Sequence, residues 1–150
     1  MRTFADLDEL TAAAGEHLGH SDWLEVTQDR VDRFADATGD HQWIHVDTER
    51  AKDGPFGGTI AHGYLTLSLI PLLGKQVYSV DNVTMGINYG LEKVRFPALL
   101  PVGSKIRVGA ELLAVADKPR GKQATLRWTI EVQGGDKPAC VAETIVLYVP

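Results

Sequence analysis

An aspartate and two histidines lie close together in the segment TGDHQWIH, which spans Thr38–His45. A carboxylate can accept a proton, and a neutral imidazole can accept or donate one near physiological pH. Asp40 and His45 could therefore form a general acid–base pair if the chain between them turns. The structural alternative is a polar helix end, in which Asp40 forms a turn and His45 is half-buried with one nitrogen hydrogen-bonded.

A metal site is a further alternative for the same residues. His41 and His45 are four positions apart, as on one face of a helix. Asp40 or His62 could add a third ligand. The sequence lacks the paired-histidine motif with an intervening glutamate, and its single cysteine, Cys140, is far away. We therefore expect no metal and no cofactor, and we expect Cys140 to be a buried apolar residue without a disulfide partner.

A second segment, GGTIAHGY, places Gly63 near the expected start of an apolar helix. The first N–H groups of a helix have no acceptor within it, and they carry partial positive charge. A glycine there lets a ligand oxygen approach the backbone closely, so Gly63 is a candidate oxyanion donor. The alternative is tight packing of the helix on a sheet, where any side chain would clash.

Helical spacing predicts the element that comes before the acid–base segment. Thr27 can cap a helix whose apolar residues recur every three to four positions, and Gly39 can end it. Asp40 then lies just beyond the helix end. Earlier in the chain, the pattern predicts a helix over 4–14 and a strand over 22–27.

The rest of the chain reads as a sheet built around one helix. Residues 60–73 are apolar on nearly all sides, which is typical of a helix surrounded by protein. An antiparallel sheet curled around this helix would bury the apolar faces of the strands that follow. The sequence therefore predicts an α+β protein with the hot-dog fold, as a single domain over 1–150. The predicted strands cover residues 88–96, 105–112, 123–132 and 140–149.

Composition sets limits on the kind of protein. With 150 residues, 44% of them hydrophobic, the chain has material for one core. The net charge of −5 is dispersed, and there is no basic stripe of the kind that nucleic-acid binding requires. The apolar runs fall short of the roughly 20 residues of a membrane helix, and the start does not resemble a signal peptide. We expect a cytoplasmic protein that binds neither nucleic acid nor membranes.

Three segments together resemble one family, the MaoC-like dehydratases, also called (R)-specific enoyl-CoA hydratases. They occur in the family's order and cover roughly 21–107. The segments are the run Phe34, Thr38-Gly39-Asp40, Ile44-His45 and Ala51, then PFGGTIAHGYLTLSL, then NYGLEKVRFPALLPVGSKIR.

This resemblance implies a hot-dog homodimer with active sites at or near the subunit interface. It implies an acyl thioester of fatty acid metabolism as substrate, carried by coenzyme A or by acyl carrier protein. By position, Asp40 and His45 match the family's catalytic pair, and Gly63 matches the backbone donor to the thioester carbonyl.

The chain departs from the family pattern where Gln42-Trp43 replaces the usual Asn-Pro. Gln42 can still hydrogen-bond, with one more methylene of reach. Apolar residues near the pair could line the acyl slot or could simply belong to the core; they are Trp43, Ile44, Phe56 and Tyr64. Cations that could face the phosphates of coenzyme A, or form a solvated face, are Lys93, Arg95, Lys105 and Arg107.

The residues and the resemblance together favour the addition of water to a trans-2-enoyl thioester, and the reverse dehydration of an (R)-3-hydroxyacyl thioester. Asp40 and His45 would act on one water, and the Gly63 N–H would bind the oxyanion. Two alternatives stay open. One is a hot-dog acyl-CoA thioesterase, and the other is a non-catalytic subunit that binds acyl thioesters beside a partner.

Overall fold

The structure is a computed structural model that describes residues 1–150. The first half of the chain contains all the helices and three short strands, and only strands follow in the second half. No helix combines the length and the apolar character needed to cross a membrane. In chain order the elements are β1 (Arg2–Phe4), α1 (Leu7–Ala12), β2 (His17–His20), β3 (Leu24–Glu25), α2 (Gln28–Thr38), α3 (Trp43–Val46), α4 (Thr48–Lys52), α5 (Gly63–Ser68), α6 (Ile70–Gly74), β4 (Tyr78–Val80), β5 (Met85–Arg95), β6 (Lys105–Lys118), β7 (Gly121–Val132) and β8 (Cys140–Val149).

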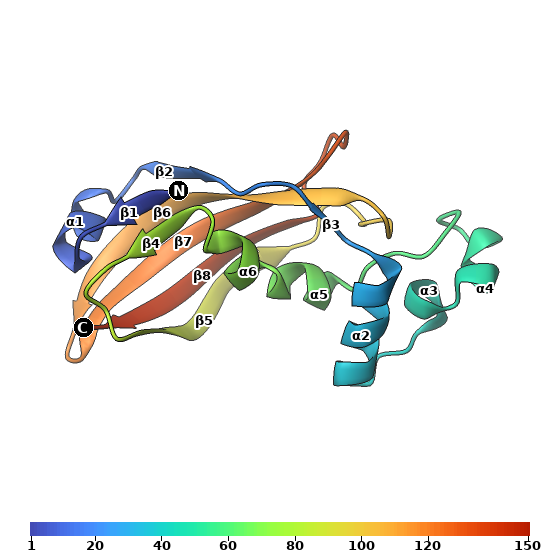
Figure 1. The fold of residues 1–150 in the computed structure, drawn as a ribbon, viewed down its shortest axis with the longest axis horizontal. Coiled ribbons are helices and arrows are strands. Elements are labelled where there is room, and N and C mark those ends of the chain that lie inside the picture. Colours follow the sequence, from blue (N-terminus) through green and yellow to red (C-terminus); the bar gives the residue numbers. More distant parts are fainter.

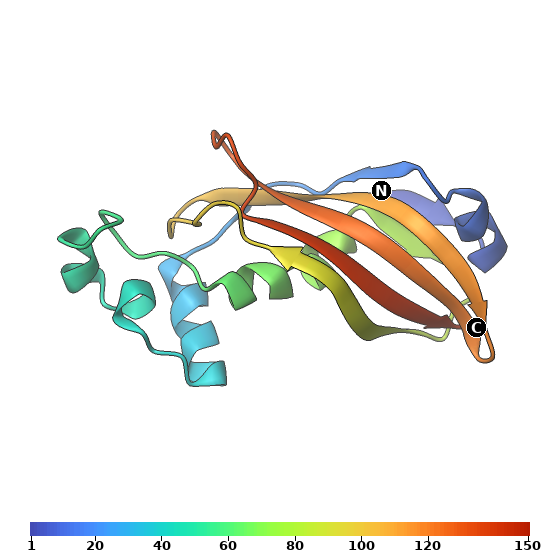
Figure 2. The same cartoon turned by 180° about the vertical axis from the view of Figure 1, so that it is seen from behind.

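The main sheet is antiparallel and has the strand order β2-β6-β7-β8-β5, with β3 also paired to β6. It curls around α5 and α6, which lie against one of its faces (Figures 1 and 2). A small parallel ladder joins β1 to β4. The α+β hot-dog fold predicted from the sequence is thus confirmed, although β1, β2 and β4 were not expected and β6 is longer than predicted.

The inner face of the sheet forms the core, as the alternating pattern of the strands predicted. Every second residue of β6 from Ile106 to Leu112, and of β7 from Ala124 to Ile130, is buried there and packs toward α5 and α6. Cys140 is also buried and is a free thiol, as expected. The inward-facing residues of the two strands are Ile106, Val108, Ala110, Leu112, Ala124, Leu126, Trp128 and Ile130.

The central helix is broken, which corrects the prediction of one helix over 60–73. Leu69 separates α5 from α6, and Pro71 lies in the first turn of α6. Proline has no N–H, and its ring clashes with the carbonyl four residues earlier in a continuous helix, so the chain restarts there. The first residues of the predicted helix are extended instead, because Ile60 pairs with Pro101 in an antiparallel bridge.

The N-terminal region also differs from the prediction. The helix expected over 4–14 is reduced to α1, which begins where the Asp6 carboxylate accepts two backbone N–H groups. The strand expected over 22–27 is reduced to β3. His17 and His20 lie in β2, which pairs with β6, and both side chains are exposed.

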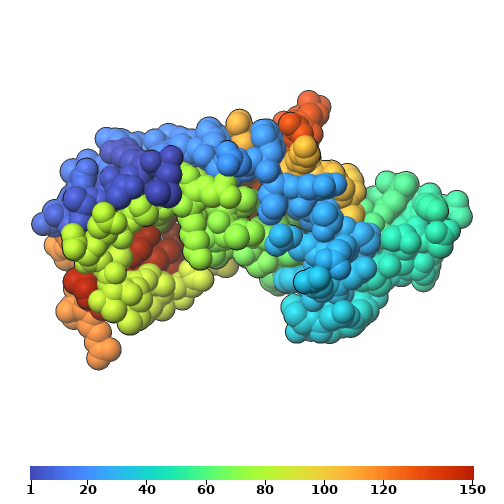
Figure 3. Space-filling model, in the orientation of Figure 1, coloured from blue at the N-terminus to red at the C-terminus, as the bar shows by residue number.

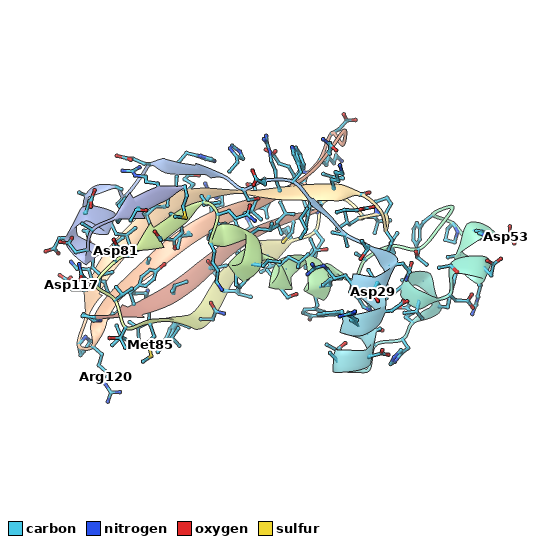
Figure 4. All side chains as sticks on the ribbon, viewed as in Figure 1. Asp29, Asp53, Asp81, Met85, Asp117 and Arg120 are labelled. Atoms are coloured by element: carbon cyan, nitrogen blue, oxygen red, sulfur yellow. The ribbon has the colours of Figure 1, made fainter.

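The helix before the acid–base segment is confirmed as α2. Its cap is the Thr27 hydroxyl, which accepts the Arg30 N–H at 3.2 Å, and it ends at Gly39 with φ 82°. Glycine is favoured at such a left-handed position because it has no Cβ. Helices α2, α3 and α4 extend beyond one end of the sheet (Figure 1), where Figure 4 labels Asp29 and Asp53. Asp40 and His45, the proposed acid–base pair, lie in this part of the protein.

Candidate active site

His45 is held in a defined orientation on the short helix α3. Its side chain is 7% exposed, and its Nδ1 atom lies 2.6 Å from the main-chain oxygen of Ile60. A carbonyl oxygen only accepts, so Nδ1 carries the proton of the neutral ring. The second nitrogen, Nε2, is therefore the one that can accept a proton from a bound water.

Asp40 is brought close to His45 by the turn at Gly39. One ligand atom each of Asp40, His45 and His62 lie within 4.8 Å of one another. Asp40 is exposed, and its Oδ1 accepts the N–H of Gln42 at 3.3 Å. On a continuous helix, residues five apart would point about 140° away from each other, so the helix break is what lets this pair converge.

His62 is the third member of this cluster, and the sequence reasoning considered it only as a metal ligand. Its ring is 2% exposed and stacks on the ring of His45, with 3.9 Å between centroids and 25° between planes. Its Nε2 atom lies 3.0 Å from the main-chain oxygen of Asp40. No local sequence signal pairs residues 22 positions apart; only the fold brings them together.

The geometry of the cluster bears on the metal alternative. Asp40, His45 and His62 each offer one ligand atom, so the cluster supplies three candidate metal ligands. The rings of His45 and His62 stack with 3.9 Å between centroids and 25° between planes, a packing contact that needs no ion. His41, proposed as a ligand with His45, instead faces Asp36 at 2.8 Å and is exposed. The hydrogen bond with Asp36 raises the pKa of His41 above its ordinary value.

Two polar residues that the sequence analysis did not identify, Gln28 and Thr59, hold the backbone of His45 in place. Gln28, in the first turn of α2, donates from Nε2 to the main-chain oxygen of His45 at 2.8 Å. Its Oε1 accepts from the Thr59 hydroxyl at 2.6 Å, and Thr59 is buried. The Ile60 N–H also donates to the Ile44 oxygen at 3.0 Å. These bonds fasten α3 to α2 and to the strand-like segment before α5.

Gly63 is the first residue of α5, so its N–H has no acceptor within that helix. A Cβ at this position would lie 3.3 Å from the ring of Phe96. Tight packing against Phe96 therefore explains why this residue is a glycine. The same packing is compatible with the Gly63 N–H acting as a backbone donor. Because α5 has only six residues, the N–H group itself matters more here than a helix dipole does.

The predicted substrate-contact residues occupy mixed environments. Trp43 is half-buried beneath the Arg50 guanidinium, 4.1 Å from its ring centroid, and Ile44 is also half-buried. Gln42 is exposed, as are Phe56 at 45% and Tyr64 at 77%. Of the proposed cations, Arg107 is paired with Glu131, whereas the other three are exposed.

A separate apolar cavity of about 660 Å³ lies between the helices α5 and α6 and the strands β5 and β8. Figure 3 shows this hollow, with β8 visible in red at its floor. None of the five predicted substrate-contact residues lines it. At the wall, the hydroxyls of Tyr78 and Tyr148 hydrogen-bond to each other at 2.5 Å, and burial raises the pKa of both.

Comparisons with known proteins show which family the chain belongs to. A family model described as a MaoC like domain matches residues 9–133. The chain is 60% identical over 150 residues to 3-hydroxyacyl-thioester dehydratase Z of Mycobacterium tuberculosis, with 99% of each chain covered. It resembles the structure of an (R)-hydratase from A. caviae involved in PHA biosynthesis, with TM-score 0.72, 26% identity, and 91% of this chain and 96% of that chain covered.

A third likeness concerns the fold alone. The monoamine oxidase regulatory protein from Archaeoglobus fulgius matches with TM-score 0.79 and 24% identity, over 99% of this chain and 97% of that chain. Fold, site and relatives together define the protein as a hydro-lyase built on the hot-dog fold. The family model covers most of the chain and the 60% identity spans nearly all of it, so this chain belongs to the MaoC-like dehydratase family.

Proposed function

We propose that the protein adds water reversibly to a trans-2-enoyl thioester and forms the (R)-3-hydroxyacyl thioester. One observation carries this proposal: ligand atoms of Asp40 and His45 lie within 4.8 Å of each other. The Nδ1 atom of His45 bonds to the Ile60 oxygen, so the Nε2 atom is the one available for the reaction. The relative at 60% identity is named a 3-hydroxyacyl-thioester dehydratase, which supports the same reaction in its reverse direction.

In the hydration direction, the oxygen of a water bound between Asp40 and His45 attacks C3 of the enoyl group. One proton of this water passes to the pair, the electrons of the double bond move toward the thioester carbonyl, and a proton from the pair reaches C2. Such acid–base help contributes typically 10² to 10⁴ in rate. The Gly63 N–H stabilises the enolate oxygen that forms between the two steps, which supplies about 10² to 10³.

The apolar tail of the substrate requires a slot, and we assign it to the 660 Å³ cavity. Leu67, which lines this cavity, lies one turn of α5 beyond Gly63. A thioester carbonyl at Gly63 could therefore direct its acyl chain along the helix into the cavity. The size of the cavity favours substrates longer than the four-carbon crotonyl group. The carrier would be coenzyme A or acyl carrier protein.

We also propose that the active form is a homodimer joined along β5. This edge strand exposes the large apolar side chains of Met85, Ile87, Tyr89 and Leu91, each between 43% and 70% exposed. An unpaired edge with such side chains is a surface that another chain can cover. Figure 4 labels Met85 at the start of this strand. Light scattering over a concentration series tests the proposal.

The dimer experiment has a matched control. Leu91→Lys should shift the mass toward the monomer, whereas His17→Lys, on the opposite edge strand β2, should leave it unchanged. A wild-type protein that stays monomeric at micromolar concentration with its hydratase activity intact would overturn the shared interface.

The reaction itself is tested with crotonyl-CoA, whose enoyl absorbance falls as water adds to the double bond. The expected product is 3-hydroxybutyryl-CoA of the R configuration, identified by chiral chromatography. Release of free coenzyme A thiol would instead identify a thioesterase. Tight binding of acyl thioesters with no turnover would identify a non-catalytic subunit.

A further inference from the structure

His62 contains the one buried side-chain nitrogen or oxygen of the protein that has no hydrogen-bond partner, its Nδ1 atom. Leaving a buried acceptor unpaired is unfavourable, so a histidine at this position needs a reason other than filling space. A phenylalanine would occupy a similar volume without an unpaired acceptor.

The other nitrogen of the same ring supplies that reason. His62 Nε2 lies 3.0 Å from the main-chain oxygen of Asp40, and a carbonyl only accepts, so Nε2 carries the proton. This bond fixes the backbone of Asp40 immediately after the left-handed turn at Gly39. Asp40 is otherwise exposed, and its carboxylate accepts only the N–H of Gln42, at 3.3 Å. The bond from His62 therefore does most to fix the position of Asp40.

The face of the His62 ring makes a second contact with the site. It stacks on His45 at 3.9 Å, and on another side it meets the ring of Phe34 at 4.9 Å. His45 is thus held by its Nδ1 bond at the ring edge and by His62 at the ring face. His62 also directly precedes Gly63, the first residue of α5.

We propose that His62 is a positioning residue that holds Asp40 and His45 together through these two contacts, the Nε2–H bond and the ring stack. This inference rests on the proposed hydratase function. His62 does not touch the reacting atoms; it keeps the carboxylate and the free imidazole nitrogen within reach of one water. Displacements of about 1 Å in such a pair can lower a rate by roughly 10².

Three substitutions separate the two contacts. In His62→Gln, the amide nitrogen reaches about as far as Nε2 and can still donate to the Asp40 oxygen, but the stack is lost. In His62→Phe, the stack remains and the donor is lost. In His62→Leu, both are lost. His41→Gln is the matched control, since His41 is exposed and its partner Asp36 lies outside the cluster.

The measurement is steady-state hydration of crotonyl-CoA, with the melting temperature recorded for each variant. We expect kcat to fall about tenfold or more in His62→Phe and further in His62→Leu, with KM within about twofold of wild type. His62→Gln should recover much of the loss seen in His62→Leu. If His62→Phe and His62→Leu both fold and keep kcat within twofold of wild type, the inference is wrong.

A double substitution distinguishes positioning from a purely structural role. In the background of Asp40→Asn, His62→Leu should lower kcat little further, because the pair that His62 positions no longer acts as one unit. The effect of His62→Leu on the melting temperature should be the same in the wild-type protein and in the Asp40→Asn variant. Multiplicative losses of kcat would overturn the inference while leaving the hydratase function intact. A wild-type protein that hydrates neither crotonyl-CoA nor longer trans-2-enoyl-CoA substrates would overturn the proposed function and the inference with it.

Discussion

The Nδ1 atom of His45 donates a hydrogen bond to the main-chain oxygen of Ile60, 2.6 Å away, and this single bond decides which nitrogen of His45 faces the site. The residue that supplies the oxygen belongs to the segment that leads into α5. The orientation of the proposed acid–base group is thus set by the same stretch of chain that presents Gly63.

Asp40 and His45 are expected to act as one unit. Asp40→Asn and His45→Gln should each lower kcat by about 10² or more with little change in KM, because each removes help given mainly in the transition state. The double variant should be scarcely worse than either single one. Steady-state hydration of crotonyl-CoA, with circular dichroism to confirm folding, measures this. Near-wild-type turnover in either single variant would remove that residue from the mechanism.

The bond between Thr59 and Gln28 is expected to hold His45 in position without taking part in the reaction. Thr59→Val leaves the Gln28 oxygen without its 2.6 Å donor at a part-buried position, which should cost about 1 kcal/mol of stability. We also expect kcat to fall several-fold, because Gln28 holds the backbone of His45. Thr59→Ser keeps the hydroxyl and serves as the control. Equal kcat and equal stability in the valine and serine variants would contradict this role.

Activity is expected to be independent of metal ions. The Nδ1 atom of His45 already bonds to the Ile60 oxygen, and the proposed proton transfers need no Lewis acid. Hydration rates before and after exhaustive chelation, with metal content measured by mass spectrometry, test this expectation. Stoichiometric zinc whose removal abolishes activity but leaves the fold intact would reverse the assignment of Asp40 and His45.

The pair of His41 and Asp36 is expected to contribute to stability only at lower pH. The hydrogen bond with Asp36 raises the pKa of His41 in the folded protein. The pair therefore contributes its full stability below the pKa of His41 in the unfolded chain, about 6.5. This stability is lost as the pH rises through the higher pKa of the folded state. His41→Gln should therefore lower the melting temperature slightly at pH 5.5 and leave it unchanged at pH 9. Activity should be retained. An effect that is larger at pH 9 would show that the pair is not what His41 contributes.

Local sequence was sufficient to predict several parts of this protein. The cap at Thr27 and the stop at Gly39 defined α2 correctly, since both depend on the chemistry of a single residue beside the backbone. Alternating apolar residues defined β6 and β7, because side chains on a strand point to opposite faces in turn. The motif around Asp40 and His45 identified the family.

Other features depended on neighbours that are distant in the chain. The short strand β2 carries no strong pattern and forms because β6 offers it a partner. The contact of His62 with Asp40 spans 22 positions. Sequence spacing along one element cannot encode such a contact, because its geometry is set by how α2, α3 and α5 pack together. The tertiary structure alone therefore decided which groups surround the proposed catalytic pair.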